Sequence, residues 1–217
     1  MIADFFHQIF GDNVVLATIL IAIVPLVELK GAIPFAMSVD FWGAAALDLW
    51  QAFLFAFLGS IIIVPILALV FRPIYDWLKT KKFFKMILDF LVGDVANKST
   101  KVNADAGQKS QAGRLWLKIV AVALFVAFPV PLTGVWTGTC FAVLLGLNFG
   151  LACVTVILGN AVCGLIVTLV CSVFPEATNI LLYVFLALVL IAVVVKVIMH
   201  VKRKRRLATV ESNNENA

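Results

Sequence analysis

Two ionisable side chains, Glu28 and Lys30, interrupt a long apolar stretch of the sequence at residues 14–40. An ionisable group at membrane depth is energetically unfavourable, so it marks a functional site by default. Burial favours the neutral form of Glu28 while the nearby positive charge of Lys30 favours the ionised form, which makes Glu28 the natural proton carrier. Lys30, together with the helix N-termini exposed after turns, suits an anionic group such as a phosphate. In the alternative interpretation the two side chains pair with each other or cap broken helices, or Lys30 reaches to the membrane surface.

A second set of polar side chains lies in the apolar stretch at residues 119–147, which contains no charged residue. Its hydroxyl groups and indole N–H could bind a substrate, or they could equally bond to their own broken helix. These candidate substrate-binding residues are Thr133, Trp136, Thr137 and Thr139. Ser60 and Asn160 are predicted to support the site as hydrogen-bonding residues between helices. No metal site and no cofactor are predicted, because the four cysteines form no CxxC pair and no histidines cluster with them.

Proline and glycine break both stretches near their centres. The predicted turn residues are Pro25, Gly31 and Pro34 in the first stretch and Pro129, Pro131, Gly134 and Gly138 in the second. Each remaining limb has about 10 to 15 residues, or roughly 15 to 22 Å of helix, which reaches the middle of a bilayer but does not cross it. The breaks predict a re-entrant helical hairpin at 14–40 and another at 119–147. The alternative for each is one kinked transmembrane helix.

The composition indicates an integral membrane protein. Of its 217 residues, 63% are hydrophobic and 13% are charged, and the mean hydropathy is +1.09. These values exclude a soluble enzyme, a nucleic-acid-binding domain and a disulfide-stapled secreted protein, so no nucleic-acid partner is expected. We also expect no enzymatic activity, because no arrangement of nucleophile, base and oxyanion donors and no ATP-binding motif is visible.

The basic residues predict the topology. Ten of the 17 Lys and Arg residues lie within 72–118 and six within 196–206, whereas acids alone flank the other membrane ends. Because basic residues mark the cytoplasmic side, the amphipathic helix and linker at 72–118 and the basic, disordered tail at 201–217 are predicted to be cytoplasmic. The interfacial helix at 1–13 is then outside. Full crossing by residues 119–147 would place the basic tail outside, which favours the hairpin.

The two halves of the chain share short motifs. VPL occurs at 24–26 and 130–132, and Leu58-Gly59-Ser60 corresponds to Leu158-Gly159-Asn160. We predict an all-α integral membrane protein with two inverted repeats, each a re-entrant helical hairpin followed by a transmembrane helix. The first repeat covers 14–71 with a span at 47–71, and the second covers 119–174 with a span at 149–174. A final transmembrane helix is predicted at 178–200.

At ELKGAIPF and PLTGVWTG the sequence resembles the putative small multidrug export family of prokaryotic membrane proteins, over most of residues 14–174. That family is similar in turn to the DedA, or SNARE-associated Golgi protein, superfamily, which has two opposed re-entrant hairpins and includes lipid scramblases and undecaprenyl-phosphate translocases. The resemblance implies a multi-pass protein of the prokaryotic inner membrane with Glu28 as the hairpin acid. DedA proteins place arginines at the second hairpin, whereas residues 129–139 contain none, which leaves Lys30 as the only cation of such a site.

These observations predict a small transporter that works by proton-coupled alternating access at Glu28. A polyprenyl phosphate or another lipid phosphate is the favoured substrate. The alternatives are a lipophilic cationic drug exported in exchange for protons, an uncoupled lipid scramblase, and a membrane scaffold that transports nothing. The expected partners are membrane lipids, an amphipathic substrate and protons, and a homodimer is left open.

Overall fold

The computed structural model describes residues 2–79, 110–130 and 133–174, together with positions 176, 178–185, 187, 190, 191, 194, 195 and 199. These residues form helices and the turns that connect them, and none of them forms a strand. The all-helical class predicted from the sequence is therefore confirmed for this part of the chain. Most of the predicted cytoplasmic linker, at 80–109, and the tail at 201–217 lie outside the described residues.

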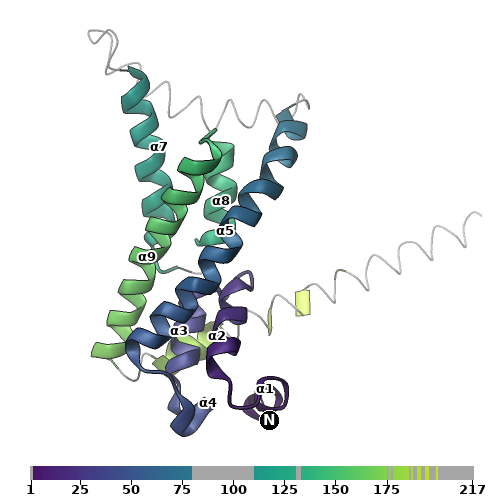
Figure 1. Cartoon of the computed structure of the whole chain (residues 1–217), viewed down its shortest axis with the longest axis vertical. Coiled ribbons are helices and arrows are strands. Elements are labelled where there is room, and N and C mark those ends of the chain that lie inside the picture. Colours follow the sequence, from purple (N-terminus) through teal and green to yellow (C-terminus); the bar gives the residue numbers. More distant parts are fainter. Residues whose placement is uncertain are drawn as a thin grey trace, which may run out of the picture.

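Two long antiparallel helices run the length of the described structure (Figure 1). They are α5 (Leu49–Lys79) and α9 (Phe149–Val173). The segments Leu49–Ile74 and Phe149–Val173 have 26 and 25 residues and are apolar enough to cross a membrane. At a rise of about 1.5 Å per residue, each exceeds the roughly 30 Å of a hydrocarbon core. Two predicted spans are thus present as helices of the required length and composition.

Four shorter helices pack as two pairs on the long helices. The first pair is α2 (Val14–Ile23) and α3 (Glu28–Met37), beside the lower half of the structure in Figure 1. The second pair is α7 (Ser110–Ala127) and α8 (Val135–Leu144), beside the upper half. The ten-residue helices α2, α3 and α8 measure about 15 Å, too short to cross a bilayer alone. The helix breaks therefore fall within both predicted stretches, while re-entry into a membrane stays a prediction.

The helix boundaries differ from the predicted ones at the linker. α5 continues past residue 71 to Lys79, and α7 begins at Ser110 instead of at residue 119. No glycine lies between residues 71 and 79 to end α5 earlier, and the residues before 119 are mostly helix formers, so polar turns extend both helices beyond their apolar segments. In the predicted final span at 178–200, the described positions are helical.

The glycines of the repeated LG motifs let a long helix approach each pair. A methyl group built on Gly59 would overlap the Ile19 carbonyl oxygen of α2, and one built on Gly159 would lie 2.6 Å from the Ala123 carbonyl oxygen of α7. Small residues permit this close backbone approach between helices in membranes. The two motifs thus perform the same packing role in the two halves of the chain.

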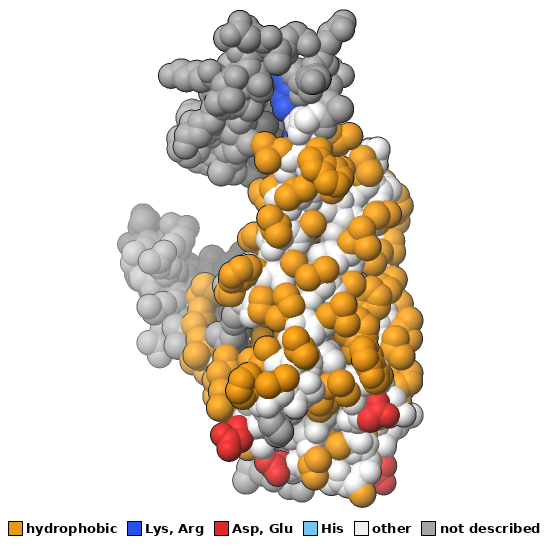
Figure 2. Space-filling model, turned by 90° about the vertical axis from the view of Figure 1, so that its left-hand side faces the viewer, with side chains coloured by type: hydrophobic (Ala, Val, Ile, Leu, Met, Phe, Trp, Pro, Cys, Tyr) orange, Lys and Arg blue, Asp and Glu red, His pale blue; other side chains and the backbone are white. Residues whose placement is uncertain are grey.

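A cluster of aromatic side chains packs at the end of the structure that carries the N-terminus. The short helices α1 (Ile2–Phe10), α4 (Val39–Trp42) and η1 (Gly43–Ala45) lie there. Phe6, on α1, packs against Phe35 and Phe41 with ring centroids 5.2 and 5.5 Å apart. Figure 2 shows apolar side chains over the flank of the molecule, with acidic side chains near this end and a basic side chain near the other.

Candidate functional site: where the two helix turns meet

The turn between α2 and α3 has an unusual backbone. It occupies residues 24–27, includes the predicted turn residue Pro25, and is followed directly by Glu28. Leu26 and Glu28 have φ angles of 76° and 50°, in the left-handed region that side chains other than glycine rarely adopt. Such residues cost on the order of 1–3 kcal/mol each and persist where the surrounding contacts hold them in place.

The Glu28 carboxylate reaches from α3 to the start of α8. The residue is only 5% exposed, and its Oε1 accepts a hydrogen bond from the Trp136 backbone N–H at 3.1 Å. Gly134, the residue before α8, lies against the same carboxylate, where a β-carbon would overlap it. A carboxylate is favourable here because the first amides and the dipole of a helix favour negative charge.

The Lys30 ammonium binds the segment that precedes α8. Lys30 is 2% exposed, and its Nζ donates to the Val130 carbonyl oxygen at 2.7 Å, to the Thr133 carbonyl oxygen, and to Thr133 Oγ at 3.2 Å. These contacts match the three donors of an ammonium group. Lys30 Nζ lies 4.0 Å from Glu28 Oε2, so each charge makes its closest contacts with the opposite turn and not with the other charge.

Helix α8 returns a contact of the same kind to the first helix pair. The Trp136 indole Nε1 donates to the carbonyl oxygen of Ile23, the last residue of α2, at 3.0 Å. The repeated VPL motif is offset by 106 residues, which makes Trp136 the counterpart of Lys30 and Val130 the counterpart of Val24. Lys30 in α3 and Trp136 in α8 therefore donate from equivalent positions to a carbonyl near the end of the first helix of the other pair. We call these contacts of Glu28, Lys30 and Trp136 the tip clasp.

The threonine hydroxyls bond within their own segments. Thr133 Oγ lies 2.8 Å from both the Phe128 and the Val130 carbonyl oxygens. The Thr137 hydroxyl accepts from the Gly134 N–H at 3.1 Å, and the buried Thr139 hydroxyl donates to the Val135 carbonyl oxygen at 2.6 Å. The structure thus brings Thr133 and Trp136 to Glu28 and Lys30, while the role of all four residues in substrate binding stays a prediction.

Three predicted turn residues lie inside helices. Gly31 and Pro34 are within α3 and Gly138 is within α8. The two glycines face close neighbours, since a methyl group on Gly31 would meet Val27 and Phe185 and one on Gly138 would overlap Val126. Pro129 and Gly134 do lie between α7 and α8, and Pro131 is outside the described residues.

Ser60 and Asn160 are buried on the two long helices. The Ser60 hydroxyl donates to the Ala56 carbonyl oxygen of its own helix at 3.0 Å. Asn160 Oδ1 has no hydrogen-bond partner among the described residues. A buried acceptor without a partner is uncommon in proteins. Of the two predicted supporting residues, Asn160 is therefore the one whose side-chain oxygen could still accept a hydrogen bond.

The partners of the charged residues were not predicted from the sequence. Glu28, Lys30 and Trp136 were all candidate site residues, but the contact of the acid with Gly134 and that of the indole with the end of α2 were not expected. The offset of 106 residues was the available signal, because it aligns Glu28 with Gly134 and Lys30 with Trp136. No group of three or more metal-ligating side chains occurs among the described residues. The arrangement can instead act as a charge-dependent contact between two short helix pairs.

These features define an all-helical membrane protein whose buried polar centre lies where two helix turns meet. Comparison with known families gives the particular family: the chain belongs to the one described as "Putative small multi-drug export protein", whose model matches residues 28–166. The matched region begins at Glu28 and includes Glu28, Lys30 and Trp136, the three residues that form the tip clasp. It does not include α2, whose last carbonyl accepts from Trp136. No curated protein and no solved structure matches the chain.

Proposed function

We propose that this protein is a membrane transporter in which the tip clasp is the gate. The observation that carries the proposal is that one buried acid and one buried amine, on the same short helix, hold the opposite turn. The family description, a multidrug export protein, supports transport as the general activity. A gate needs a contact that is strong when closed and can be released by a small chemical change, and a buried carboxylate provides one.

Protonation of Glu28 is the proposed trigger. A neutral carboxyl group interacts less favourably with the start of α8 and with the Lys30 ammonium than a carboxylate does. Loss of that attraction would free Lys30 and the first amides of α8, and would allow α3 to separate from α8. In alternating access, the site faces one side of the membrane when Glu28 is protonated and the other side when it is ionised. Transport is then coupled to the movement of protons.

We infer that the two helix pairs are re-entrant hairpins related as inverted repeats, as in the DedA superfamily. The short helices, the equivalent glycines Gly59 and Gly159, and the reciprocal donors Lys30 and Trp136 support this inference. The acidic side chains near one end and a basic side chain near the other support an outside N-terminus and a cytoplasmic 72–118 segment.

Asp12→Cys and Arg114→Cys test this topology. Both positions are exposed, and we expect an impermeant thiol reagent to label the first only from outside and the second only from the cytoplasm of intact cells, after the native cysteines are replaced. If both positions label from the cytoplasm, the first hairpin is a simple span and the inverted repeat is incorrect.

A lipid phosphate, such as a polyprenyl phosphate, is the substrate class that we favour. Once the clasp opens, Lys30 and the start of α8 would present a cation and backbone amides to a phosphate group. A lipophilic cation exchanged for protons is the second candidate, favoured by the buried carboxylate of Glu28 and by the family description. The contacts of Glu28 and Lys30 would also be explained by a purely structural role. An uncoupled scramblase and a scaffold are therefore the alternatives that the experiments below must distinguish from a transporter.

Proton flux in proteoliposomes tests the transport proposal. Under an imposed proton gradient, a short-chain polyprenyl phosphate or a lipophilic cationic dye should change the internal pH if it is a substrate. Glu28→Gln should abolish that flux while the protein stays folded, and Asp12→Asn, which removes an exposed carboxylate, should leave it unchanged. Absence of flux with either compound would favour the scramblase or the scaffold.

Lys30→Gln distinguishes the two substrate classes in the same assay. Flux driven by the lipid phosphate should collapse, because the cation that Lys30 supplies to the phosphate is lost, whereas flux driven by a cationic dye should survive or increase. The reverse pattern would exclude the lipid phosphate.

A further inference from the structure

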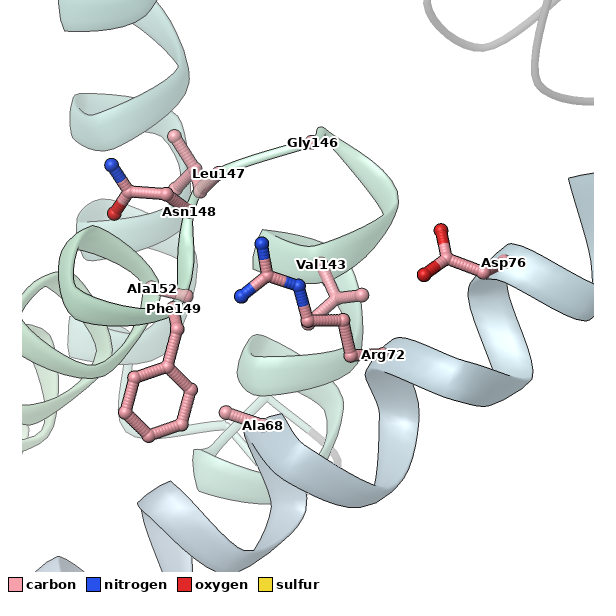
Figure 3. Close-up of a pocket in the computed structure, with 9 residues that line it drawn as sticks. All are labelled: Ala68, Arg72, Asp76, Val143, Gly146, Leu147, Asn148, Phe149 and Ala152. Carbon is pink, nitrogen blue, oxygen red and sulfur yellow. The ribbon is translucent and has the colours of Figure 1, made fainter.

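A separate pocket opens near the far end of α5, opposite the turn between α8 and α9 (Figure 3). Its volume is about 220 Å³. Arg72 and Asp76 line it from α5, and Val143, Gly146, Asn148 and Phe149 line it from the opposite side. None of the lining residues belongs to the tip clasp, so this pocket is a second site.

Arg72 supplies the pocket with an unused positive charge. Its side chain extends from α5 toward Phe149 and the α8–α9 turn (Figure 3). It is exposed and takes part in no hydrogen bond or ion pair with another described side chain, and the Asp76 carboxylate one turn later does not pair with it. A guanidinium group presents five N–H donors in a planar fork that matches a phosphate.

The pocket stands at the boundary of the apolar surface. Ile66, Leu69 and Val70 on α5 are 50%, 61% and 49% exposed and lie within the six residues before Arg72, and the apolar segment of α5 ends at Ile74. Acyl chains of a lipid can therefore lie along α5 while the headgroup reaches Arg72. The start of α9, beside Phe149, adds the positive end of a long helix to the same pocket.

We propose that this pocket binds the phosphodiester headgroup of an anionic membrane phospholipid, with Arg72 as its main ligand. The volume suits this assignment, because pockets that enclose a whole drug-sized molecule measure about 300–1,000 Å³. At about 220 Å³, this pocket can hold the headgroup alone. The acyl chains would then lie outside it, on the apolar face of α5. This inference does not depend on the proposed transport function.

Binding of phosphatidylglycerol to the purified full-length protein in detergent tests the proposal, with native mass spectrometry as the readout. Arg72→Gln should weaken binding of the first lipid by about 10-fold, which corresponds to about 1.4 kcal/mol and to the loss of a charge-assisted hydrogen bond. Arg114→Gln is the matched control, since it removes an exposed arginine at the same end of the molecule but outside the pocket. It should retain affinity, and Arg72→Lys should weaken binding less than Arg72→Gln does.

Two results would overturn the proposal. Equal affinity losses in Arg72→Gln and Arg114→Gln would show that the lipid responds to general surface charge. In the second experiment, inorganic phosphate at millimolar concentration competes with the lipid. If phosphate displaces the lipid fully, the pocket binds a soluble phosphate instead of a lipid headgroup. Thermal unfolding of both Arg72 variants should match that of the unmodified protein, because Arg72 has no hydrogen bond or ion pair with another described residue.

Discussion

Gly134→Ala is expected to destabilise the protein by about 1–3 kcal/mol, the range for adding atoms to a closely packed site. A methyl group at this position would overlap the Glu28 carboxylate. Gly134 has an extended backbone with φ −151° and ψ −153°, so the effect comes from this overlap and not from a forbidden backbone angle. Unfolding in mixed micelles measures the change, and the proton-flux assay should lose its signal in parallel.

Gly113→Ala is the matched control. It lies in α7, and a methyl group there meets no atom within 4 Å. Because alanine is about 0.8–1.0 kcal/mol more favourable than glycine inside a helix, this variant should be as stable as the unmodified protein or slightly more stable. A similar loss in both variants would show that Gly134 has no special contact.

Combining Gly134→Ala with Glu28→Ala tests the origin of the effect. Shortening residue 28 removes the atoms with which the new methyl group collides, so the double variant should cost clearly less than the sum of the two single changes. Additive effects would show that Gly134 acts through another neighbour, and the assigned contact with Glu28 would be incorrect.

The sequence predicted the helical class and both long helices because long apolar segments leave few alternatives. A run such as 149–174 can satisfy its backbone in a membrane only as a helix. It also predicted a break in the helix pattern at Glu28 and Lys30, because proline and charge interrupt the apolar run there; the turn in fact lies at residues 24–27, directly before Glu28, and Lys30 is inside α3. These are local properties, which length and composition can reveal.

The partners of the charged residues required the tertiary structure. Nothing near Glu28 in the chain specifies that its carboxylate meets Gly134, or that Lys30 meets Val130, about 100 residues away. The turn residues show the same limit: Gly31 and Gly138 interrupt the pattern as turn glycines would, yet they serve helix contacts. Glycine permits both a turn in the backbone and a close approach between two helices. The sequence alone therefore cannot decide which of these two roles a glycine has.

Lys30→Met is expected to cost about 3–5 kcal/mol, the range for removing one partner of a buried charged pair. The ammonium now satisfies the carbonyl oxygens of Val130 and Thr133 and lies near Glu28. A methionine of similar length fills the space but leaves the two oxygens without this donor and the carboxylate without a neighbouring cation. The free energy of unfolding in mixed micelles measures the loss.

Lys118→Met provides the comparison that decides what the clasp contributes. Lys118 also donates to a backbone carbonyl, that of Leu145 at 2.7 Å, but it is only partly buried and pairs with no acid in the part of the chain that the structure describes. Its removal should cost about 1 kcal/mol, as for a typical single hydrogen bond. Adding Glu28→Gln to Lys30→Met should recover part of the larger loss, since it removes the uncompensated charge. If Lys30→Met is instead as mild as Lys118→Met, the two turns are held by apolar packing alone, and neutralising Glu28 could not open them.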